Sequence, residues 1–294
     1  MLTTAAPPAS APPIPRPRDD ELDLFGLTHK GLVRAENEDQ FLLCTVHPQV
    51  VIHATSLPDS SSIAQRGQRL ATIMLVADGV GGSAAGSRAS LIATEAVTRY
   101  VASSLRCYNA VGAATEGEFE ATLRAAAIDA HETVRSEAAA IANEAGMATT
   151  LSLGIVVWPW MYVVQVGDSR CYLHAGGKLS QLTRDQTFAQ ELVDQGVFTR
   201  DDAKTSPLNN VLSSALGAPE ALPEITRVEI SERGSVILLC TDGLTKHVTD
   251  AEIADHLAKL QTAEQTANEL LQLALSRGGT DNISMVLGCR RRSL

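Results

Sequence analysis

The chain has 294 residues, 45% of them hydrophobic, and a formal net charge of -10. This length allows one large core or two small ones, while the acidic balance argues against nucleic-acid binding, which needs a basic face. No stretch is long and apolar enough for a membrane span, and five single cysteines are typical of reduced thiols in a cytoplasmic protein.

The N-terminus is rich in Ala and Pro, and residues 1–21 are predicted to form a disordered arm that lacks the features of a secretory signal. A single domain is expected over residues 22–291. It opens with strands at 25–28 and 40–46. The mostly polar segment 47–68 follows, and we expect a loop insertion there because it has a turn-forming cluster and no hydrophobic period.

The middle of the chain begins with a buried strand at 72–77. Apolar residues then recur at a spacing of three and four, which predicts amphipathic helices at 85–105 and 116–142. Four strands joined by tight turns are expected next, at 149–158, 161–166, 171–174 and 179–182.

The last third is predicted to contain a short helix, an irregular polar segment, a strand, two helices and a closing strand, at 188–195, 199–223, 236–240, 250–260, 264–276 and 283–289. This order lacks the regular alternation of strand and helix of a doubly wound sheet. Tight turns between neighbouring strands imply antiparallel pairing. We therefore predict an α+β layered fold with antiparallel sheets at the centre and helices outside.

Four acidic residues stand beside glycines or turns at the ends of predicted strands: Asp78, Asp168, Asp242 and Asp281. Strand ends deliver these carboxylates to the edge of a sheet, where they would repel one another without a cation. Hard oxygen ligands suit Mg²⁺ or Mn²⁺. The first hypothesis is therefore a multi-metal site at a sheet edge.

Each motif alone also has an ordinary structural explanation. Asp78 and Asp242 could cap helices, Asp281 could form an Asx turn, and Asp168 could lie in a hairpin turn. The charged run 34–39 would most often be a solvated surface. Its functional interpretation is an arginine that binds phosphate oxygens beside acids that bind metal-bound water.

Taken together, seven segments stand in a specific order, at 31–39, 78–82, 147–150, 167–170, 182–185, 240–244 and 279–282. The sequences and spacing of these segments resemble the motifs of the metal-dependent protein serine/threonine phosphatases of the protein phosphatase 2C family, above all its compact bacterial members. The resemblance covers residues 24–290. It implies a four-layer α-β-β-α sandwich that hydrolyses phosphoserine and phosphothreonine on proteins, using water activated between two Mn²⁺ or Mg²⁺ ions.

The resemblance also implies the metal ligands. Asp78 would bridge the two ions, Asp242 and Asp281 would complete one of them, and the Gly79 carbonyl would help to hold the other. Asp168 matches the ligand of a third, weaker metal ion in bacterial relatives.

The first loop carries the remaining implied roles. Arg34 would bind the substrate phosphate, and Glu38 and Asp39 would contact metal-bound waters. One departure is Lys246, which stands where the family often has an acid for the third metal. A cation there would weaken that metal or replace it with an ammonium group. A second departure is the lack of a clear counterpart to the proton-donating histidine of many eukaryotic members.

Two other functions are alternatives to a phosphatase. A non-catalytic phosphoprotein-binding regulator on the same fold would be marked by loss of the metal acids, but Asp78, Asp242 and Asp281 are present. A haloacid-dehalogenase-like enzyme needs an Asp-x-Asp nucleophile and a parallel sheet, and neither is evident. The expected partners are a phosphoprotein substrate and a cognate serine/threonine kinase or its targets. We expect the protein to be a monomer. The segment 199–223 is expected to contain a flap near the active site.

Overall fold

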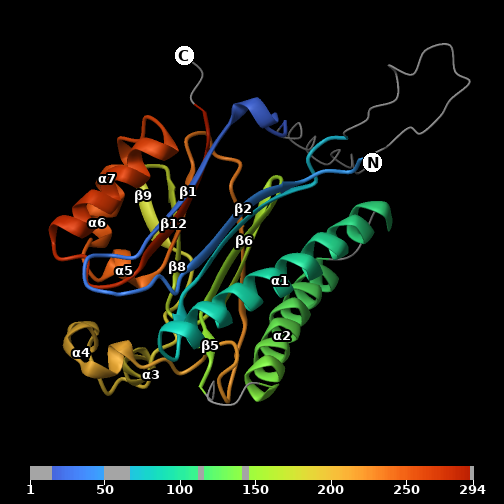
Figure 1. The fold of residues 1–294 in the computed structure, drawn as a ribbon. Coiled ribbons are helices and arrows are strands. Elements are labelled where there is room, and N and C mark those ends of the chain that lie inside the picture. The colour runs from blue at the N-terminus through green and yellow to red at the C-terminus, as the bar shows by residue number, and fades with distance from the viewer. Residues whose placement is uncertain (1–14, 50–66, 112–115, 141–145, 292–294) are drawn as a thin grey trace, which may run out of the picture.

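Two five-stranded antiparallel sheets pack face to face, with helices on both outer faces (Figure 1). The computed structural model describes residues 15–49, 67–111, 116–140 and 146–291. The predicted α+β fold and its four α-β-β-α layers are confirmed.

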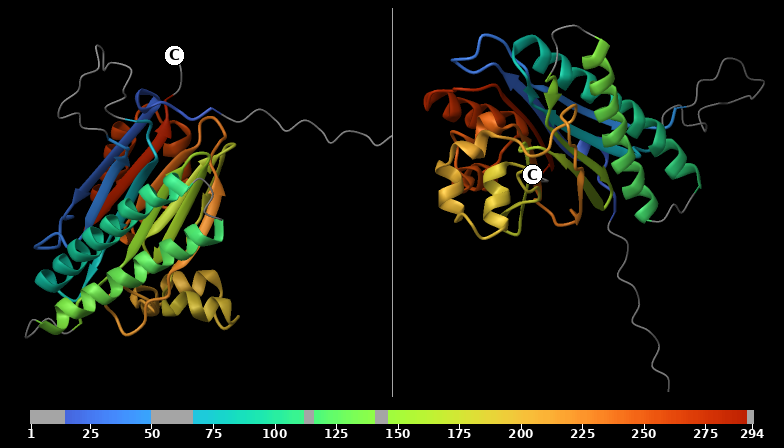
Figure 2. Two further views of the ribbon diagram at one scale, coloured as in Figure 1. Left: turned by 90° about the vertical axis from the view of Figure 1, so that its right-hand side faces the viewer. Right: turned by 90° about the horizontal axis from the view of Figure 1, so that it is seen from below.

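The first sheet has the strand order β10-β7-β6-β3-β2. Its strands are β2 (Gln40–Val46), β3 (Ala71–Ala77), β6 (Leu151–Val157), β7 (Trp160–Val166) and β10 (Glu224–Glu229). Side chains of β3 alternate, so that Ile73 and Leu75 pack into the core beneath the helices while Met74 and Val76 pack toward the second sheet. Helices α1 (Ser83–Val111) and α2 (Glu116–Ala140) cover its outer face (Figure 2).

The second sheet has the order β1-β12-β11-β8-β9. Its strands are β1 (Leu22–His29), β8 (Arg170–Ala175), β9 (Lys178–Gln181), β11 (Val236–Cys240) and β12 (Ile283–Arg290). Its outer face is covered by α5 (Asp242–Thr245), α6 (Asp250–Ala258) and α7 (Ala263–Ser276). Three apolar cores, one at each interface between layers, therefore fix both sheets and the positions of their strand ends.

The predicted strand 149–158 is interrupted at Thr150. Before the interruption, β5 (Ala148–Thr149) pairs with the two-residue strand β4 (Gly79–Val80) that follows Asp78. The Thr150 N–H donates to the carbonyl of Asp78 at 2.9 Å. The chain thus changes partner between β5 and β6, at the sheet end that carries the acidic residues.

The prediction that 199–223 is wholly irregular is wrong. After α3 (Phe188–Asp194), the chain forms α4 (Arg200–Thr205) and a 3-10 helix (Pro207–Asn210). Thr199 and Asp202 form a reciprocal capping box that starts α4, and this sequence signal was missed. Strand β10 and helix α5 were also missed, because an edge strand with alternating charges and a four-residue helix carry little hydrophobic pattern.

The last residues of the arm predicted to be disordered form local structure against the domain. Residues Asp19–Glu21 form a 3-10 helix. Buried Arg69 pairs with Asp19 and donates to the Pro17 carbonyl at 2.8 Å. Residues 1–14, and residues 50–66 of the predicted insertion, lie outside the described part. No helix in the described ranges has the length and apolar character needed to cross a membrane.

Candidate active site

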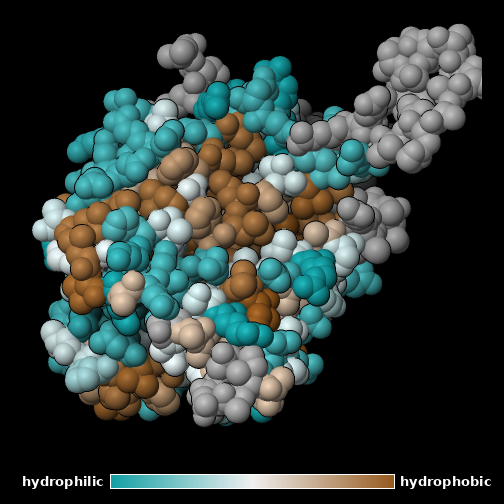
Figure 3. All heavy atoms as spheres, viewed as in Figure 1, coloured by the Kyte–Doolittle hydropathy of each residue, from teal (hydrophilic) through white to brown (hydrophobic). Residues whose placement is uncertain are grey.

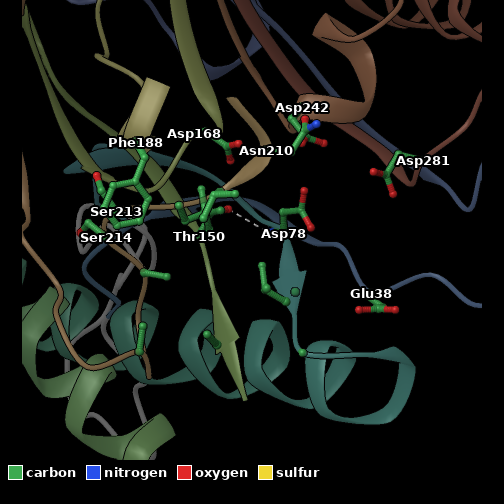
Figure 4. A pocket seen from close by; sticks show the side chains of 18 of the residues that line it. Glu38, Asp78, Thr150, Asp168, Phe188, Asn210, Ser213, Ser214, Asp242 and Asp281 are labelled. Atoms are coloured by element: carbon green, nitrogen blue, oxygen red, sulfur yellow. Dashed lines mark hydrogen bonds between the residues drawn. The ribbon is translucent and has the colours of Figure 1, made fainter. Parts of the chain in front are cut away.

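A cavity of about 850 Å³ opens at the sheet edge where the acidic residues were expected to meet. Asp78, Asp168, Asp242 and Asp281 all line it (Figure 4). Asp78 follows β3, Asp168 follows β7, Asp242 follows β11, and Asp281 precedes β12. Residues up to 203 positions apart in sequence, from 78 to 281, therefore converge because strands of both sheets end at the same place.

The backbone of Asp78 is held on both sides by two threonines. The Thr150 hydroxyl oxygen accepts from the Asp78 N–H at 2.9 Å, and the Thr149 hydroxyl donates to the Asp78 carbonyl at 2.8 Å. The Thr150 hydroxyl is also 2.7 Å from the hydroxyl of Ser169, which neighbours Asp168. This buried network ties the positions of Asp78 and Asp168 together.

The turn that carries Asp168 is fixed by buried glutamines. Gln165 donates through Nε2 to the carbonyls of Gly167 and Ser169, at 2.8 and 2.6 Å. The Gly167 N–H donates to Oε1 of Gln186 at 2.9 Å. Gly167 has φ +96°, and a Cβ at this position would lie 2.7 Å from the Thr150 side chain. The site therefore requires glycine next to Asp168.

Asn282 holds the first loop against the segment before β12. Its amide nitrogen donates to the carbonyls of Lys30 and Glu36, both at 2.9 Å. Its amide oxygen accepts from the Glu38 N–H at 2.8 Å. Asn282 is buried, so these bonds fix the loop that presents Arg34 and Glu38 to the cavity. Its place in a recognised motif was the available signal, but its bonding role was not predicted.

Glu38 and Gly79 meet at the start of α1. The Glu38 carbonyl accepts from the Ser90 hydroxyl at 2.6 Å, and a Cβ on Gly79 would lie 2.8 Å from that same carbonyl. Glu38 and Gly79 both line the cavity. Desolvation raises the pKa of the Glu38 carboxyl, although the charge of Arg34 opposes this shift. The close packing places a carboxylate and a backbone carbonyl on the same side of the cavity.

Asp39 lies behind the cavity rather than on its wall. Its side chain accepts from the Thr241 hydroxyl at 2.8 Å, directly before Asp242 in sequence. Burial raises the pKa of Asp39 to about 7, an effect that hydrogen bonds from Ser284 and Thr241 reduce. Within the described residues, Asp39 Oδ1 has no hydrogen-bond partner. Asp39 thus supports Asp242 through Thr241 and retains a bonding site of its own.

The acids at the centre of the cavity destabilise each other's ionised form. Desolvation, and then repulsion from neighbouring carboxylates including Asp242, raises the pKa of both Asp78 and Asp168. Lys246 partly offsets this for Asp168. Acids in this position favour either protonation or a nearby cation.

The cationic side chains of Arg34 and Lys246 form ion pairs with the carboxylates of Asp281 and Asp242. Arg34 reaches Asp281 with two nitrogens, at 2.8 Å through Nε and 3.0 Å through an Nη. Lys246 Nζ lies 2.6 Å from Asp242 Oδ2 and 2.7 Å from Asp281 Oδ2. Burial alone would raise the pKa of Asp281, but Lys246 and Arg34 together lower it. The predicted phosphate-binding Arg34 is thus at the cavity rim, paired with a predicted metal ligand.

As the side chains stand, no three His, Cys, Asp or Glu residues in the described ranges are arranged to hold one metal ion. Asp242 and Asp281 are instead paired with Lys246, and Asp281 is also paired with Arg34. The residue set nevertheless fits a divalent cation. All donors are oxygens, and Oδ1 of Asp242, like that of Asp39, is buried without a partner among the described residues. A hard cation would use these oxygens and relieve the repulsion.

Comparison with known proteins identifies the family. The protein phosphatase 2C family model matches residues 54–277. The serine/threonine protein phosphatase PstP of Mycobacterium tuberculosis is 33% identical over 258 residues, which cover 88% of this chain and 43% of PstP. The serine/threonine phosphatase stp of Listeria monocytogenes is 33% identical over 215 residues, which cover 73% of this chain and 83% of stp.

A solved structure agrees with these relatives. The catalytic domain of PstP, determined in complex with 2 manganese ions, superimposes with a TM-score of 0.70 at 28% identity, covering 92% of this chain and 99% of that domain. The present chain spans less than half the length of the mycobacterial protein but most of the listerial one. The sequence match over most of the chain and the shared sandwich lead to one assignment. The chain belongs to the protein phosphatase 2C family.

Proposed function

We propose that this chain is a metal-dependent phosphatase that hydrolyses phosphoserine and phosphothreonine on proteins. The observation that carries the proposal is the convergence of Asp78, Asp242 and Asp281 on one cavity whose rim carries Arg34. An acidic cavity would by itself repel a phosphate dianion. A cavity that collects carboxylates beside an arginine is therefore suited to phosphate only when divalent cations are bound there.

Two Mn²⁺ or Mg²⁺ ions would be held by Asp78, Asp242, Asp281 and the Gly79 carbonyl. When bound, such ions supply a water nucleophile of lowered pKa and neutralise charge on the phosphoryl group. Support comes from the unpartnered, buried Asp242 Oδ1 and from the manganese ions in the related PstP domain. Asp168 would contribute to a third, weaker site. Glu38 and Asp39 would orient waters around the ions.

Arg34 would bind the substrate phosphate. Its side chain is half exposed, and its guanidinium already makes a forked contact with a carboxylate. The same fork matches two phosphate oxygens, so a phosphate can replace Asp281 as its partner when Asp281 binds metal. Contact with both the metal ions and Arg34 would orient the phosphate for attack and stabilise its negative charge in the transition state.

The substrate is a phosphoprotein, and a cognate serine/threonine kinase or its targets are the expected partners. We place the enzyme in the cytoplasm, which the free, buried thiols of Cys171 and Cys240 support, and we expect a monomer.

The experiment is phosphate release from a phosphothreonine peptide. Protein stripped with EDTA and dialysed should be inactive, and Mn²⁺ should restore turnover in a saturable manner. Activity that persists in excess EDTA would contradict the proposed metal dependence. Tight peptide binding without turnover at saturating Mn²⁺ would instead identify a non-catalytic phosphoprotein binder.

A further inference from the structure

The ammonium group of Lys246 bridges two carboxylates that lie next to the ends of separate strands. Asp242 follows β11 and Asp281 precedes β12, yet both lie within 2.7 Å of the same nitrogen. These are the two residues that would complete one metal ion under the proposed function. One positively charged group of the chain therefore stands between the ligands of a divalent cation.

The backbone fixes this arrangement. The N–H of Lys246 donates to the Asp242 carbonyl at 2.8 Å, which closes the turn of α5. Side chains four residues apart on a helix lie on the same face, so the lysine reaches back over Asp242. The side chains of Lys246, Asp242 and Asp281 retain 32%, 18% and 14% of their accessible surface. An ion pair this far buried is screened less than a surface pair.

We propose that Lys246 is a built-in counter-ion that competes with a divalent metal ion for Asp242 and Asp281. In the metal-free protein, the ammonium group holds the two carboxylates together and limits their repulsion. To bind metal at this position, the chain must move the ammonium group away, which lowers the affinity for the ion. This inference rests on the proposed function, because it concerns the metal centre of that function.

The test compares wild-type protein with Lys246→Met, which keeps the length of the side chain and removes its charge. Mn²⁺ binding to EDTA-stripped protein is measured by calorimetric titration. We expect Mn²⁺ to bind at Asp242 and Asp281 about tenfold or more tightly in Lys246→Met, since a partly buried ion pair no longer opposes binding. Thermal unfolding without metal should occur at a lower temperature in Lys246→Met, and saturating Mn²⁺ should remove that deficit.

Two further variants serve as controls. Lys246→Arg keeps the charge and should retain weak Mn²⁺ binding close to that of the wild type. Lys204→Met removes an exposed lysine whose ion pair with Asp201 lies at 3.3 Å, and it should change neither Mn²⁺ affinity nor metal-free stability. Equal Mn²⁺ affinities in wild type and Lys246→Met would overturn the inference and leave the proposed function standing. Failure of both proteins to bind Mn²⁺ would overturn the metal centre itself.

The cavity lining also includes three exposed apolar residues, Val80, Phe188 and Val211, and the neighbouring pair Phe188 and Val211 is called the apolar wall. These side chains are 41%, 45% and 44% exposed, although all three line the cavity. The Phe188 N–H donates to the Val211 carbonyl at 2.9 Å, which holds the two residues side by side. Figure 4 places Phe188 on the Asp168 side of the cavity, away from Asp281, and Figure 3 shows hydrophobic residues gathered over the α3–α4 region. Exposed apolar side chains beside a polar cavity are typical of a binding surface.

The charges near this wall restrict what it can bind. Among the described residues that line the cavity, Arg34 and Lys246 are the lysines and arginines, and both pair with the central acids. Glu220 adds a further carboxylate to the lining. We infer that the apolar wall receives an apolar side chain adjacent to the phosphorylated residue of the substrate protein. Apart from the metal ions of the proposed function, an acidic side chain there would meet carboxylates and, among the described residues of the lining, no lysine or arginine beyond Arg34 and Lys246.

This second inference also rests on the proposed function, and peptides test it. Phosphothreonine peptides carry Leu, Ser or Glu at the position before or after the phosphothreonine. We expect kcat/KM to be about tenfold higher for Leu than for Glu at one of these positions. Phe188→Ser should reduce this ratio, whereas Val197→Ser, which alters an exposed valine that does not line the cavity, should preserve it.

The possible results distinguish a failure of the apolar specificity from a failure of the phosphatase function. Equal kcat/KM values for all peptides would overturn the apolar specificity while confirming phosphatase activity. A ratio that Phe188→Ser leaves unchanged would also overturn the role of this wall. An absence of hydrolysis with every peptide at saturating Mn²⁺ would overturn the proposed function.

Discussion

The Thr150 hydroxyl oxygen accepts a hydrogen bond from the backbone N–H of Asp78 at 2.9 Å, and the Thr150 N–H donates back to the Asp78 carbonyl at the same distance. The same hydroxyl meets Ser169 at 2.7 Å, next to Asp168. One buried threonine therefore sets the position of two acids from different strand ends. The reaction proposed for the cavity depends on that position.

Thr150→Val tests whether the Thr150 hydroxyl positions Asp78, because valine keeps the shape of the side chain and removes the hydroxyl. The Asp78 N–H loses its side-chain acceptor, at a cost of about 1–3 kcal/mol in the free energy of unfolding. Displacement of Asp78 should lower kcat by about tenfold to a hundredfold. Thr150→Ser keeps the hydroxyl and should remain close to the wild type. Chemical denaturation and initial rates check both effects, and a Thr150→Val protein with wild-type stability and kcat would contradict the positioning role.

Arg34→Lys tests the proposed phosphate fork. Lysine retains the charge but cannot make two parallel hydrogen bonds, so kcat/KM for a phosphothreonine peptide should fall by about tenfold or more. Mn²⁺ affinity should not weaken, since Asp281 loses a competing partner. Arg88→Lys is the matched control, because Arg88 pairs with Glu137 on the helical layer and does not line the cavity. Unchanged kcat/KM in Arg34→Lys would exclude Arg34 as a phosphate ligand.

Asp242→Asn tests the metal assignment at a single ligand. The amide removes a negative charge from the proposed site, so at least one Mn²⁺ ion and most activity should be lost. Asp255→Asn makes the same chemical change on the exposed side of α6 and should leave both properties intact. If Asp242→Asn keeps wild-type turnover, Asp242 is not a metal ligand.

Gly167→Ala tests the tight turn before Asp168. The added Cβ would lie 2.7 Å from the Thr150 side chain, and the alanine would have to keep the φ of +96° that Gly167 adopts. Gly177 has φ +75° but open space around its Cβ position, so Gly177→Ala reports the backbone cost alone. We expect Gly167→Ala to destabilise by roughly 1–3 kcal/mol more than Gly177→Ala. Equal losses in urea denaturation would show that the contact with Thr150 does not matter.

Much of the fold was predictable because its elements carry strong patterns. The predicted strands at 40–46 and 236–240 coincide with β2 and β11, and the long helical periods at 85–105 and 116–142 correspond to α1 and α2. The convergence of the strand-end acids was also predictable, since antiparallel strands of two stacked sheets share an edge. The edge strand β10 was not predictable in this way, because its charged residues, Glu224, Arg227 and Glu229, are spaced without the regular alternation that marks a core face.

The bonds that hold the site together were not predictable from patterns. Thr150, Asn282 and Thr241 lie inside recognised motifs, but their partners are distant in sequence and depend on how the two sheets stack. Lys246 shows the same limit. Its charge at a position where relatives often have an acid was evident, whereas its bridge between Asp242 and Asp281 required the structure.

The most direct test of the central claim is a crystal structure of the chain grown with Mn²⁺ and analysed for anomalous scattering from manganese. We expect two strong Mn²⁺ peaks within coordination distance of Asp78, with Asp242 and Asp281 sharing one of them and Lys246 moved aside. Anomalous maps without a manganese peak near any of these three carboxylates would contradict the assignment of this cavity as the metal centre of a phosphatase.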